Sequence, residues 1–445
     1  MKVSISGIRG IYGKDLTLNE IYRFSSMFSL FLKNSKKERV KCIVARDTRH
    51  SGEIIKKIIV SSLLENGIDV YDMNISPTPV IFRESRKFEG AIIITASHNP
   101  INWNGIKFII KGRGLFEYEL KELLSKKSYH DILPPYGTLE NFSSTYSNEL
   151  LELLQQSKDG DSHPKKIGID GGGGATCCYV EDLFKKIGHI TYVINGNPSI
   201  FSRGPDPTTD NLIQLKSIVK SCDLDYGFSF DLDGDRLVVV SNNGQKLNSD
   251  STLLLCIAKC MNIFKIKNFV TSLDTSNAID QFIKNNNGNL IYSKVGEANV
   301  VQKILETNAD AGGEGSSAGF IMSNFNWCRD GILASVLIST IDQSLFQECM
   351  DLASNYSQIR DKMSINIDLQ DKIMEKLQEE FKSDSTEIIT IDGIKIILDD
   401  TSWILFRSSN TENALRISIE SNPYKIKSIY RTTINRVKKI YDQTK

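Results

Sequence analysis

The amino-acid sequence predicts an α/β protein with three similar α/β domains, whose mixed sheets are largely parallel, and a C-terminal α+β domain, all around one central cleft. Short continuous apolar runs alternate with amphipathic helical segments, which is typical of parallel sheets covered by helices on both faces. This alternation occurs three times along the chain. The last ~80 residues then change in character, which indicates a separate domain.

The first unit ends in a loop that carries reactive side chains. Its predicted strands and helix cover residues 40–47, 51–67, 68–74 and 90–96, the helix being 51–67. The segment TASHNP, residues 95–100, follows the last strand and brings Ser97 to its carboxyl end. Ligands of open α/β sheets bind outside the carboxyl ends of the strands, so Ser97 is a candidate site residue.

The second and third units end in polar loops at the equivalent place. In the second, strands at 165–170, 189–195 and 225–230 and a helix at 180–188 lead to DLDGDR, residues 231–236. In the third, strands at 267–275 and 289–295, helices at 276–286 and 298–308 and a further strand from 309 lead to GGEGSSAG, residues 312–319. Because each loop leaves the carboxyl end of a strand, the three loops can share one composite active site.

The C-terminal segment has the pattern of a small α+β domain. Its predicted elements are a helix at 369–381, a hairpin over 387–398, strands at 402–406 and 414–420, and a closing helix at 425–443. Asp392 and Gly393 form the hairpin turn. The expected domains are residues 1–150, 151–248, 249–363 and 364–445, although no low-complexity or Pro-rich linker marks their boundaries.

The composition argues against several classes of partner and site. The 445-residue chain has 54 basic and 54 acidic residues, so its overall charge favours neither nucleic acid nor an anionic membrane. It has no run of about 18 apolar residues and no signal-peptide pattern, so we expect a cytoplasmic protein. Its eight cysteines form no CxxC pair, which argues against disulfides or zinc. Cys256 and Cys260 are expected to pack in the core.

DLDGDR has the chemistry of a magnesium site. Asp231, Asp233 and Asp235 alternate along it, and Gly234 lets the backbone turn so that three hard oxygen donors face one point. Crowded carboxylates repel each other unless a cation lies among them. The spacing excludes an EF-hand, because Arg236 replaces its required glycine. A phosphatase of the haloacid dehalogenase type, with Asp231 as nucleophile, stays as an alternative, although Asp235 stands where that motif has Thr or Val.

Ser97 is a candidate nucleophile. A serine hydroxyl is weak unless an adjacent base or a metal ion activates it. His98 follows it directly, but the GxSxG motif of serine hydrolases is absent, which argues against a hydrolase triad. We therefore predict that Ser97 carries a phosphoryl group whose charge is balanced by Mg²⁺ and basic side chains, since phosphoryl transfer depends mainly on positioning and charge neutralisation.

Basic side chains in several loops suit a phosphorylated ligand. The cations next to glycines or strand ends are Arg9, Arg46, Arg49, Lys107 and Arg236. RSSNTENALR, residues 407–416, adds Arg407, Ser408, Ser409, Asn410, Thr411 and Arg416. Arginine matches phosphate bidentately, and hydroxyl and amide groups fill the remaining acceptor positions. In GGEGSSAG, the side chains of Glu314, Ser316 and Ser317 can bond the hydroxyl groups of a sugar, although a simple turn would have the same composition.

Together these motifs resemble those of the α-D-phosphohexomutase superfamily, which contains phosphoglucomutase, phosphomannomutase and phosphoglucosamine mutase. The matching segments, in the order of the family, are SGIRG, ARDTR, TASHNP with NGIKF, FSRGPDPTTDNL, DLDGDR, GGEGSSAG, RDG at 329–331 and RSSNTEN. The resemblance spans nearly the whole chain. TASHNP together with DLDGDR is highly specific for the superfamily.

The resemblance implies an isomerase that interconverts hexose or hexosamine 1-phosphate and 6-phosphate through a phosphoserine and a bisphosphorylated sugar. The implied catalytic residues are Ser97, Arg9, Lys107 and His98. The implied Mg²⁺ ligands are Ser97, Asp231, Asp233 and Asp235. The implied substrate contacts are Arg236, Glu314, Ser316, Arg407, Ser409, Asn410, Thr411 and Arg416. Mg²⁺ and a hexose 1,6-bisphosphate are the implied cofactors, and small sugar phosphates are the implied partners.

The sugar loop departs from the bacterial pattern. Bacterial phosphomannomutases and phosphoglucosamine mutases have Ser-Gly-His after the loop glutamate, whereas this chain reads GEGSSAG, which resembles the archaeal-type loop. The expected activities are phosphoglucosamine mutase or a bifunctional phosphomannomutase/phosphoglucomutase. A Mg²⁺-dependent sugar phosphatase and a catalytically inactive sugar-phosphate sensor are the alternatives. A homodimer stays an open alternative to the monomer.

Overall fold

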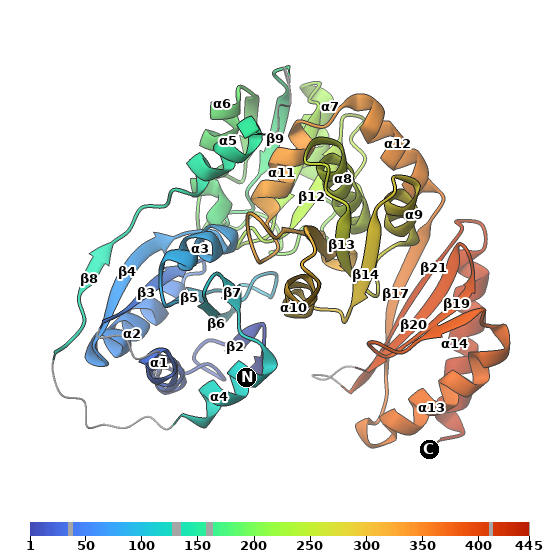
Figure 1. Ribbon diagram of the computed structural model, residues 1–445, viewed down its shortest axis with the longest axis horizontal. Coiled ribbons are helices and arrows are strands. Elements are labelled where there is room, and N and C mark those ends of the chain that lie inside the picture. The colour runs from blue at the N-terminus through green and yellow to red at the C-terminus, as the bar shows by residue number, and fades with distance from the viewer. Residues whose placement is uncertain (34–38, 127–134, 157–162, 409–412, 445) are drawn as a thin grey trace.

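Four units follow one another around an arc in the computed structural model (Figure 1), which describes residues 1–33, 39–126, 135–156, 163–408 and 413–444. The N-terminal and C-terminal units lie at the two ends of the arc, and the second and third units lie between them. Three units are α/β layers and the fourth is a β-rich unit with two long helices, so the predicted fold class is confirmed.

The first unit is built on an eight-stranded sheet with helices on both faces. Its strands lie in the order β1 (Lys2–Ser4), β2 (Gly7–Ile11), β6 (Trp103–Ile110), β5 (Gly90–Ile94), β3 (Val40–Arg46), β4 (Ile68–Ile75) and β8 (Leu139–Asn141), with β7 (Arg113–Gly114) paired to β6. One face packs on α1 (Leu18–Lys33), α2 (Gly52–Glu65) and α4 (Glu117–Ser125), and the other on α3 (Thr78–Glu84). Because both faces are covered, β5 is buried throughout and reads as a continuous apolar run.

The second and third units each contain a four-stranded sheet. The second has the order β10 (Ile190–Ile194), β9 (Lys166–Asp170), β11 (Tyr226–Phe230), β12 (Leu237–Ser241). The third has the order β14 (Asn289–Ser293), β13 (Asn268–Ser272), β15 (Ala311–Glu314), β16 (Gly319–Met322). Their helices are α5 (Tyr146–Gln156), α6 (Val180–Ile187), α7 (Ile213–Ser221), α8 (Ser249–Ile263), α9 (Asn277–Asn285), α10 (Glu297–Thr307), α11 (Gly331–Ser339) and α12 (Gln343–Ser354).

The first three units share one strand order. In each, three neighbouring strands are parallel and the next strand along the chain pairs antiparallel with the last of them, as β6 does with β5, β12 with β11 and β16 with β15. A short connection can join only antiparallel neighbours, so each polar loop predicted above is the connection of such a pair. The three loops therefore occupy equivalent positions.

The fourth unit is an antiparallel sheet with the order β17 (Ser357–Ser364), β21 (Ala414–Ser421), β20 (Ser402–Ser408), β19 (Ile394–Asp399) and β18 (Glu387–Ile389). The helices α13 (Gln370–Phe381) and α14 (Ile426–Asp442) cover one face. Trp403 and Leu405 on the other face pack against Leu273 of the third unit. This sheet includes β17, which begins at Ser357, whereas the sequence analysis placed the domain boundary between residues 363 and 364. The sequence pattern does not reveal β17, because it is an edge strand whose residues are mostly polar.

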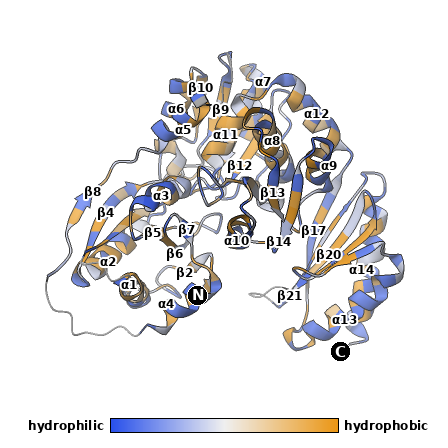
Figure 2. Cartoon of the chain, in the orientation of Figure 1, coloured by the Kyte–Doolittle hydropathy of each residue, from blue (hydrophilic) through white to orange (hydrophobic). Residues whose placement is uncertain are grey.

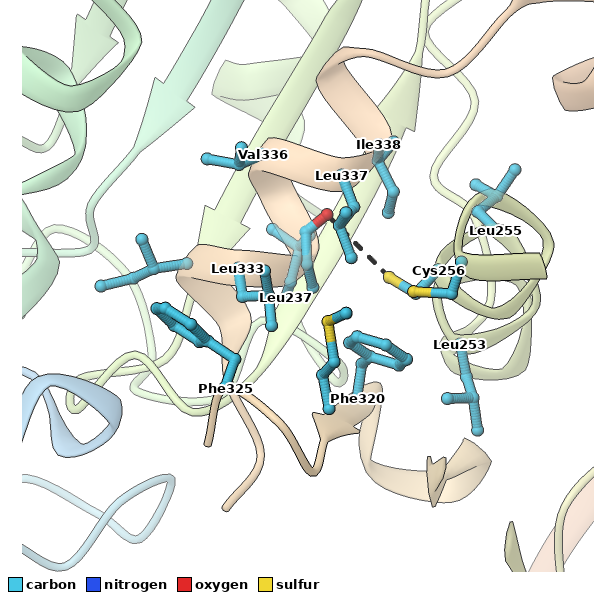
Figure 3. Close-up of a cluster of buried hydrophobic side chains, with 14 of the residues drawn as sticks. Leu237, Leu253, Leu255, Cys256, Phe320, Phe325, Leu333, Val336, Leu337 and Ile338 are labelled. Atoms are coloured by element: carbon cyan, nitrogen blue, oxygen red, sulfur yellow. Dashed lines mark hydrogen bonds between the residues drawn. The ribbon is translucent and has the colours of Figure 1, made fainter. Parts of the chain in front are cut away.

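The largest core lies between the second and third sheets. Every residue of α11 is buried (Figure 2 colours this helix as hydrophobic), and α11 packs beside α8 (Figure 3). Cys256 and Cys260 of α8 are fully buried, as expected for core residues. Short 3-10 helices are η1 (Ser85–Lys87), η2 (Ala175–Cys178), η3 (Gly315–Ser317), η4 (Ile367–Leu369) and η5 (Lys382–Asp384). None of the helices in the described ranges has the length and apolar character needed to span a membrane.

Candidate active site

Ser97 lies in the loop that joins β5 to β6, with its side chain turned toward the second unit. Its Oγ donates a hydrogen bond to Asp231 Oδ2 at 2.9 Å and lies 3.3 Å from His98 Nδ1. The backbone of Ser97 is in the left-handed region, with φ of 49°, and its N–H donates to Thr95 Oγ1 at 2.8 Å. A non-glycine residue held in this region indicates that the surrounding contacts fix the loop.

Arg49 fixes the loop that follows β5, residues 95–103 (the serine loop), by bonding its backbone carbonyls. Its guanidinium donates to the backbone carbonyls of Ser97 (2.6 Å), Asn99 (2.7 Å), Pro100 (2.6 Å) and Trp103 (3.0 Å). The charge is balanced by Asp47 at 3.0 Å, and both side chains are fully buried. Arg46 instead pairs with Glu53 on α2. The sequence analysis named Arg46 and Arg49 among the cations that suit a phosphorylated ligand. Neither is among the described residues that line the cavity of about 640 Å³ in which the other cations meet, because Arg49 bonds Asp47 and the serine loop, and Arg46 bonds Glu53 and the carbonyl of Asp47.

The three aspartates of the second loop converge on one point. Asp231, Asp233 and Asp235 are buried, and each offers one carboxylate oxygen within 4.8 Å of the other two. Gly234 has φ of +73°, and a Cβ at this position would lie 2.5 Å from Thr176 Cγ2, so the turn requires glycine. Burial and the neighbouring aspartates raise the pKa of Asp231 well above its usual range. The group is therefore costly without a cation among its oxygens.

The oxygen atoms of this cluster fit a hard divalent cation. Asp233 Oδ2 accepts from Thr78 Oγ1 at 2.7 Å, and Asp235 Oδ2 accepts from Arg329 at 2.6 Å. Asp233 Oδ1 and Asp235 Oδ1 are buried and have no hydrogen-bond partner within the described residues. Two unpartnered carboxylate oxygens beside Asp231 and the Ser97 hydroxyl form a donor set of the kind that Mg²⁺ prefers. The residues present thus fit the predicted magnesium site.

Cations from the first and second units lie near the aspartates. Lys107 of β6 pairs with Glu297 at the start of α10, at 3.1 Å. Burial would lower the pKa of Lys107, but Glu297 and the aspartates raise it, so its ammonium stays charged. Arg236 pairs with Asp206 at 3.2 Å. The Arg9 side chain lines the cavity of about 640 Å³, which also has Lys107 and Arg236 on its wall, and it makes no ion pair with any described residue.

Arg329 and Glu297 are site residues that the sequence analysis did not select. Arg329 reaches Asp235 at 2.6 Å, Glu314 at 3.2 Å and Glu297 at 3.3 Å. Although burial alone would lower the pKa of Arg329, the three carboxylates raise it. Its guanidinium therefore connects the loop of the three aspartates, residues 231–236 (the metal loop), to the loop of Glu314, residues 312–319 (the sugar loop). The RDG motif at 329–331 was the available signal for Arg329, whereas Glu297 looked like an ordinary acidic residue at a helix start.

The third loop presents carboxylate and hydroxyl groups. Glu314 is buried and accepts from the backbone N–H of Gly296 at 2.7 Å, and burial raises the pKa of this carboxyl. Ser316 lies in η3 on the wall of the same cavity. Asp274 follows β13 and is also buried beside this loop. One Asp274 oxygen accepts from Ser272 Oγ at 2.7 Å, and no cation of the described residues lies within 4.0 Å of its carboxylate.

The fourth unit contributes a row of cations. Lys362 on β17 lies opposite Arg416 on β21, which lies opposite Arg407 on β20. Arg360 stands two residues before Lys362 on the same strand and reaches Asp250 at 3.0 Å. The side chains of all four line the cavity. Ser409, Asn410 and Thr411 were also predicted to bind substrate, and they lie outside the described residues.

One cavity joins these groups. It has a volume of about 640 Å³ and is lined by residues of all four units. Its wall includes Arg9, His98 and Lys107 from the first unit, Arg236 from the second, Glu314, Ser316 and Arg329 from the third, and Arg360, Arg407 and Arg416 from the fourth. Burial and the nearby arginines lower the pKa of His98 to about 3, so its imidazole is neutral at physiological pH. Cations thus occur at both ends of a cavity of substrate size.

The chain is similar to known proteins over nearly its whole length. Residues 1–127, 144–244 and 248–358 match the phosphoglucomutase/phosphomannomutase α/β/α domains I, II and III. The chain is 31% identical over 442 residues to a phosphoglucomutase/phosphomannomutase of Thermococcus kodakarensis, covering 93% of each chain. It is 30% identical to a phosphoglucosamine/phosphogalactosamine mutase of Sulfurisphaera tokodaii, covering 98% of each chain.

Solved structures share the fold. A phosphoglucomutase/phosphomannomutase family protein from Burkholderia thailandensis superposes with a TM-score of 0.82 at 24% identity, covering 98% of each chain. The open form of parafusin, a phosphoglucomutase from Paramecium, superposes with a TM-score of 0.78 at 18% identity, covering 99% of this chain and 95% of parafusin.

Proposed function

We propose, since this chain belongs to the phosphoglucomutase/phosphomannomutase family of α-D-phosphohexomutases, that it interconverts the 1-phosphate and 6-phosphate of a hexose or hexosamine through a phosphoserine at Ser97. The observation that carries the proposal is the hydrogen bond from Ser97 Oγ to Asp231, beside two unpartnered aspartate oxygens. Mg²⁺ bound by Asp231, Asp233 and Asp235 would neutralise charge on the phosphoryl oxygens next to Ser97.

The phosphoryl transfer conserves atoms and charge. The bond between phosphorus and Ser97 Oγ breaks, a bond between phosphorus and the sugar oxygen forms, and the proton of the sugar hydroxyl ends on Ser97 Oγ. Asp231 Oδ2 and His98 Nδ1 lie within 3.3 Å of Ser97 Oγ, the oxygen on which that proton ends. Lys107 is held in its charged form by Glu297 and stabilises the negative charge that develops between the two oxygens. The reverse sequence at the other end of the sugar returns a phosphoryl group to Ser97.

The two groups of cations favour a mutase over a phosphatase. Arg9, Lys107 and Arg236 lie at the serine end of the cavity, and Arg407 and Arg416 lie on the fourth unit. A bisphosphorylated sugar needs cations at both ends, whereas hydrolysis of a monoester needs them only at the reacting phosphate. The sensor alternative does not explain why a serine hydroxyl faces three carboxylates. We propose a hexose 1,6-bisphosphate as the intermediate and activator for this reason.

Asp274 favours a hexosamine phosphate among the candidate substrates. Its carboxylate is buried beside Glu314 on the cavity wall, and it makes no ion pair with the described residues. A buried carboxylate is stabilised when a cation binds next to it, and the ammonium group of a 2-amino sugar is such a cation. Neutral sugars offer only hydroxyl donors at this position. We therefore propose hexosamine phosphates as the preferred substrates.

The test is ³¹P NMR of glucosamine 6-phosphate, glucose 6-phosphate and mannose 6-phosphate, each incubated with the protein, Mg²⁺ and a trace of the matching bisphosphate. We expect a 1-phosphate signal with the wild type and none with Ser97→Ala. Ser221→Ala, which removes an exposed hydroxyl at the end of α7, serves as the control and should retain turnover. Full activity of Ser97→Ala would refute the phosphoserine. Release of inorganic phosphate alone would establish a phosphatase instead.

A further inference from the structure

The segment between β10 and α7, residues 195–212, bonds both ends of the metal loop. Arg203 donates to the backbone carbonyl of Phe230 at 2.6 Å and to the Asp170 carboxylate at 2.7 Å. Asp206, three residues later, pairs with Arg236 at 3.2 Å. Phe230 precedes Asp231 and Arg236 follows Asp235, so these two contacts lie on either side of the three aspartates.

The glycine turn at residues 171–174 lies between this segment and the metal loop. A Cβ on Gly172 would lie 2.6 Å from the Arg203 guanidinium, and one on Gly174 would lie 2.8 Å from the carbonyl oxygen of Leu232. Ala175, the next residue, donates its backbone N–H to that same carbonyl at 2.8 Å. The absence of side chains at the turn thus lets the segment approach the metal loop closely.

The same segment also contacts the support of the serine loop. Ser199 Oγ donates to the backbone carbonyl of Thr48 at 2.8 Å, and the Phe201 ring lies 5.5 Å from the His50 ring, edge to face. Thr48 and His50 flank Arg49, which holds the loop of Ser97. One segment of the second unit therefore touches the supports of both halves of the reaction centre.

The orientation of Arg236 depends on this segment. Asp206 is itself preset, because its Oδ1 accepts from the N–H and the hydroxyl of Thr208 at 3.0 and 2.7 Å. Its Oδ2 holds one terminal nitrogen of Arg236. The Nε of Arg236 is buried without a hydrogen-bond partner in the described residues, and its nearest carboxylate oxygen, on Asp235, is 3.9 Å away. Arg236 lines the cavity together with His98, which adjoins Ser97.

We propose that Asp206 is a positioning residue that fixes Arg236 with its free N–H groups toward the phosphoryl group transferred at Ser97. Arg203 fixes the opposite end of the metal loop in the same way. This inference rests on the proposed mutase reaction. Groups that hold a binding residue in place contribute about 10- to 100-fold in activity or metal affinity when they are removed.

The test compares Asp206→Asn with Asp210→Asn. Asparagine keeps the oxygen that accepts from Thr208 but turns an amide toward Arg236, so the ion pair is lost while the turn remains. Asp210 lies in the same segment and bonds the N–H of Leu212 at 2.7 Å without touching the metal loop. We expect kcat of Asp206→Asn to fall about 10- to 100-fold, with KM for the sugar phosphate within about threefold, because the cations of the fourth unit are unchanged. Asp210→Asn should match the wild type.

A double variant separates positioning from a general structural role. If Asp206 acts through Arg236, then Asp206→Asn lowers kcat in the wild type but adds little loss in an Arg236→Gln background. An equal fold loss in both backgrounds, or an unchanged kcat in Asp206→Asn, would overturn the proposal. In Arg203→Lys, the single lysine nitrogen cannot replace the bonds of Arg203 to both Asp170 and the Phe230 carbonyl. Because the metal loop is then held less firmly, the Mg²⁺ concentration that gives half the maximal rate should rise. A wild type without Ser97-dependent turnover would instead refute the proposed function.

Discussion

Arg49→Lys tests how the serine that carries the phosphoryl group is held in place. The Arg49 side chain makes five hydrogen bonds, one to Asp47 and four to carbonyls of the serine loop. Lysine keeps a positive charge opposite Asp47 but has only three N–H donors on a single nitrogen. At least two of the five acceptors therefore lose their partner in the variant.

The magnitude follows from these lost bonds. A buried acceptor without a partner costs about 1–3 kcal/mol. The carbonyls of Asn99, Pro100 and Trp103 are only partly buried, so the lower end applies, and two lost bonds cost about 2 kcal/mol of the local stability of the loop. Since about 1.4 kcal/mol is a factor of ten, the loop should open at least about 30-fold more often. The fraction of time that the Ser97 hydroxyl spends away from Asp231 should rise by the same factor.

Hydrogen–deuterium exchange measures this opening directly. The backbone amides of residues 95–104 should exchange at least about 30-fold faster in Arg49→Lys than in the wild type, and kcat should fall while KM changes little. Arg46→Lys is the matched control, because Arg46 ends β3, three residues before Arg49, and bonds Glu53 and the carbonyl of Asp47 instead of the serine loop. If Arg49→Lys exchanges its amides and turns over substrate at the same rates as the wild type, then Arg49 does not fix the serine loop.

Three further predictions address the metal, the sugar and the domain contact. Mg²⁺ at about 100 times its Kd should stabilise the wild type by about 2.7 kcal/mol, seen as a raised melting temperature, and Asp233→Asn should diminish this shift; no shift in the wild type would contradict the metal site. Asp274→Asn should lower kcat/KM about 10- to 100-fold for glucosamine 6-phosphate but less than about threefold for glucose 6-phosphate, because a charge-assisted bond contributes about 1.5–3 kcal/mol. Equal losses for the two sugars would exclude Asp274 as the selector, and so would a similar selectivity change in Asp361→Asn, which alters another carboxylate on the cavity wall. Lys395 of β19 donates to the backbone carbonyl of Leu273 in the third unit at 2.9 Å. Burial lowers the pKa of Lys395 from 10.5 to about 8, so between these values the folded protein binds fewer protons than the unfolded chain. The free energy of unfolding should therefore rise with pH in this window, relative to Lys395→Met, and denaturant titrations at pH 7.5 to 10.5 that show a constant difference would contradict it.

The residues that could be predicted from the sequence lie in loops whose chemistry is local. Asp231 directly follows β11, Ser97 lies three residues after β5, and Glu314 ends β15. The position of a loop at a strand end is fixed by the neighbouring residues. The strand order then brings these loops into one cavity. For this reason the fold class and most candidate site residues could be inferred before any coordinates were known.

The residues that could not be predicted act through distant partners. Arg329 meets Asp235 and Glu297 across long separations in the chain, and no local pattern encodes such pairs. Arg49 resembles any cation after a strand, and only its burial shows that its bonds go to the serine loop. The strand β17 lacks a continuous apolar run because it lies at a sheet edge, so its membership of the fourth unit depends on its pairing with β21.

The arrangement of equivalent loops in successive units has a consequence for how activity appears during refolding. Ser97 meets Asp231 across the junction of the first and second units, and Asp235 meets Arg329 across the junction of the second and third. Each sheet can regain its own hydrogen bonds while it is still separate, since domains of a large chain generally fold as units. The reaction centre forms only when three finished units dock. Circular dichroism should therefore recover before turnover does, and the delay between them measures the docking step alone.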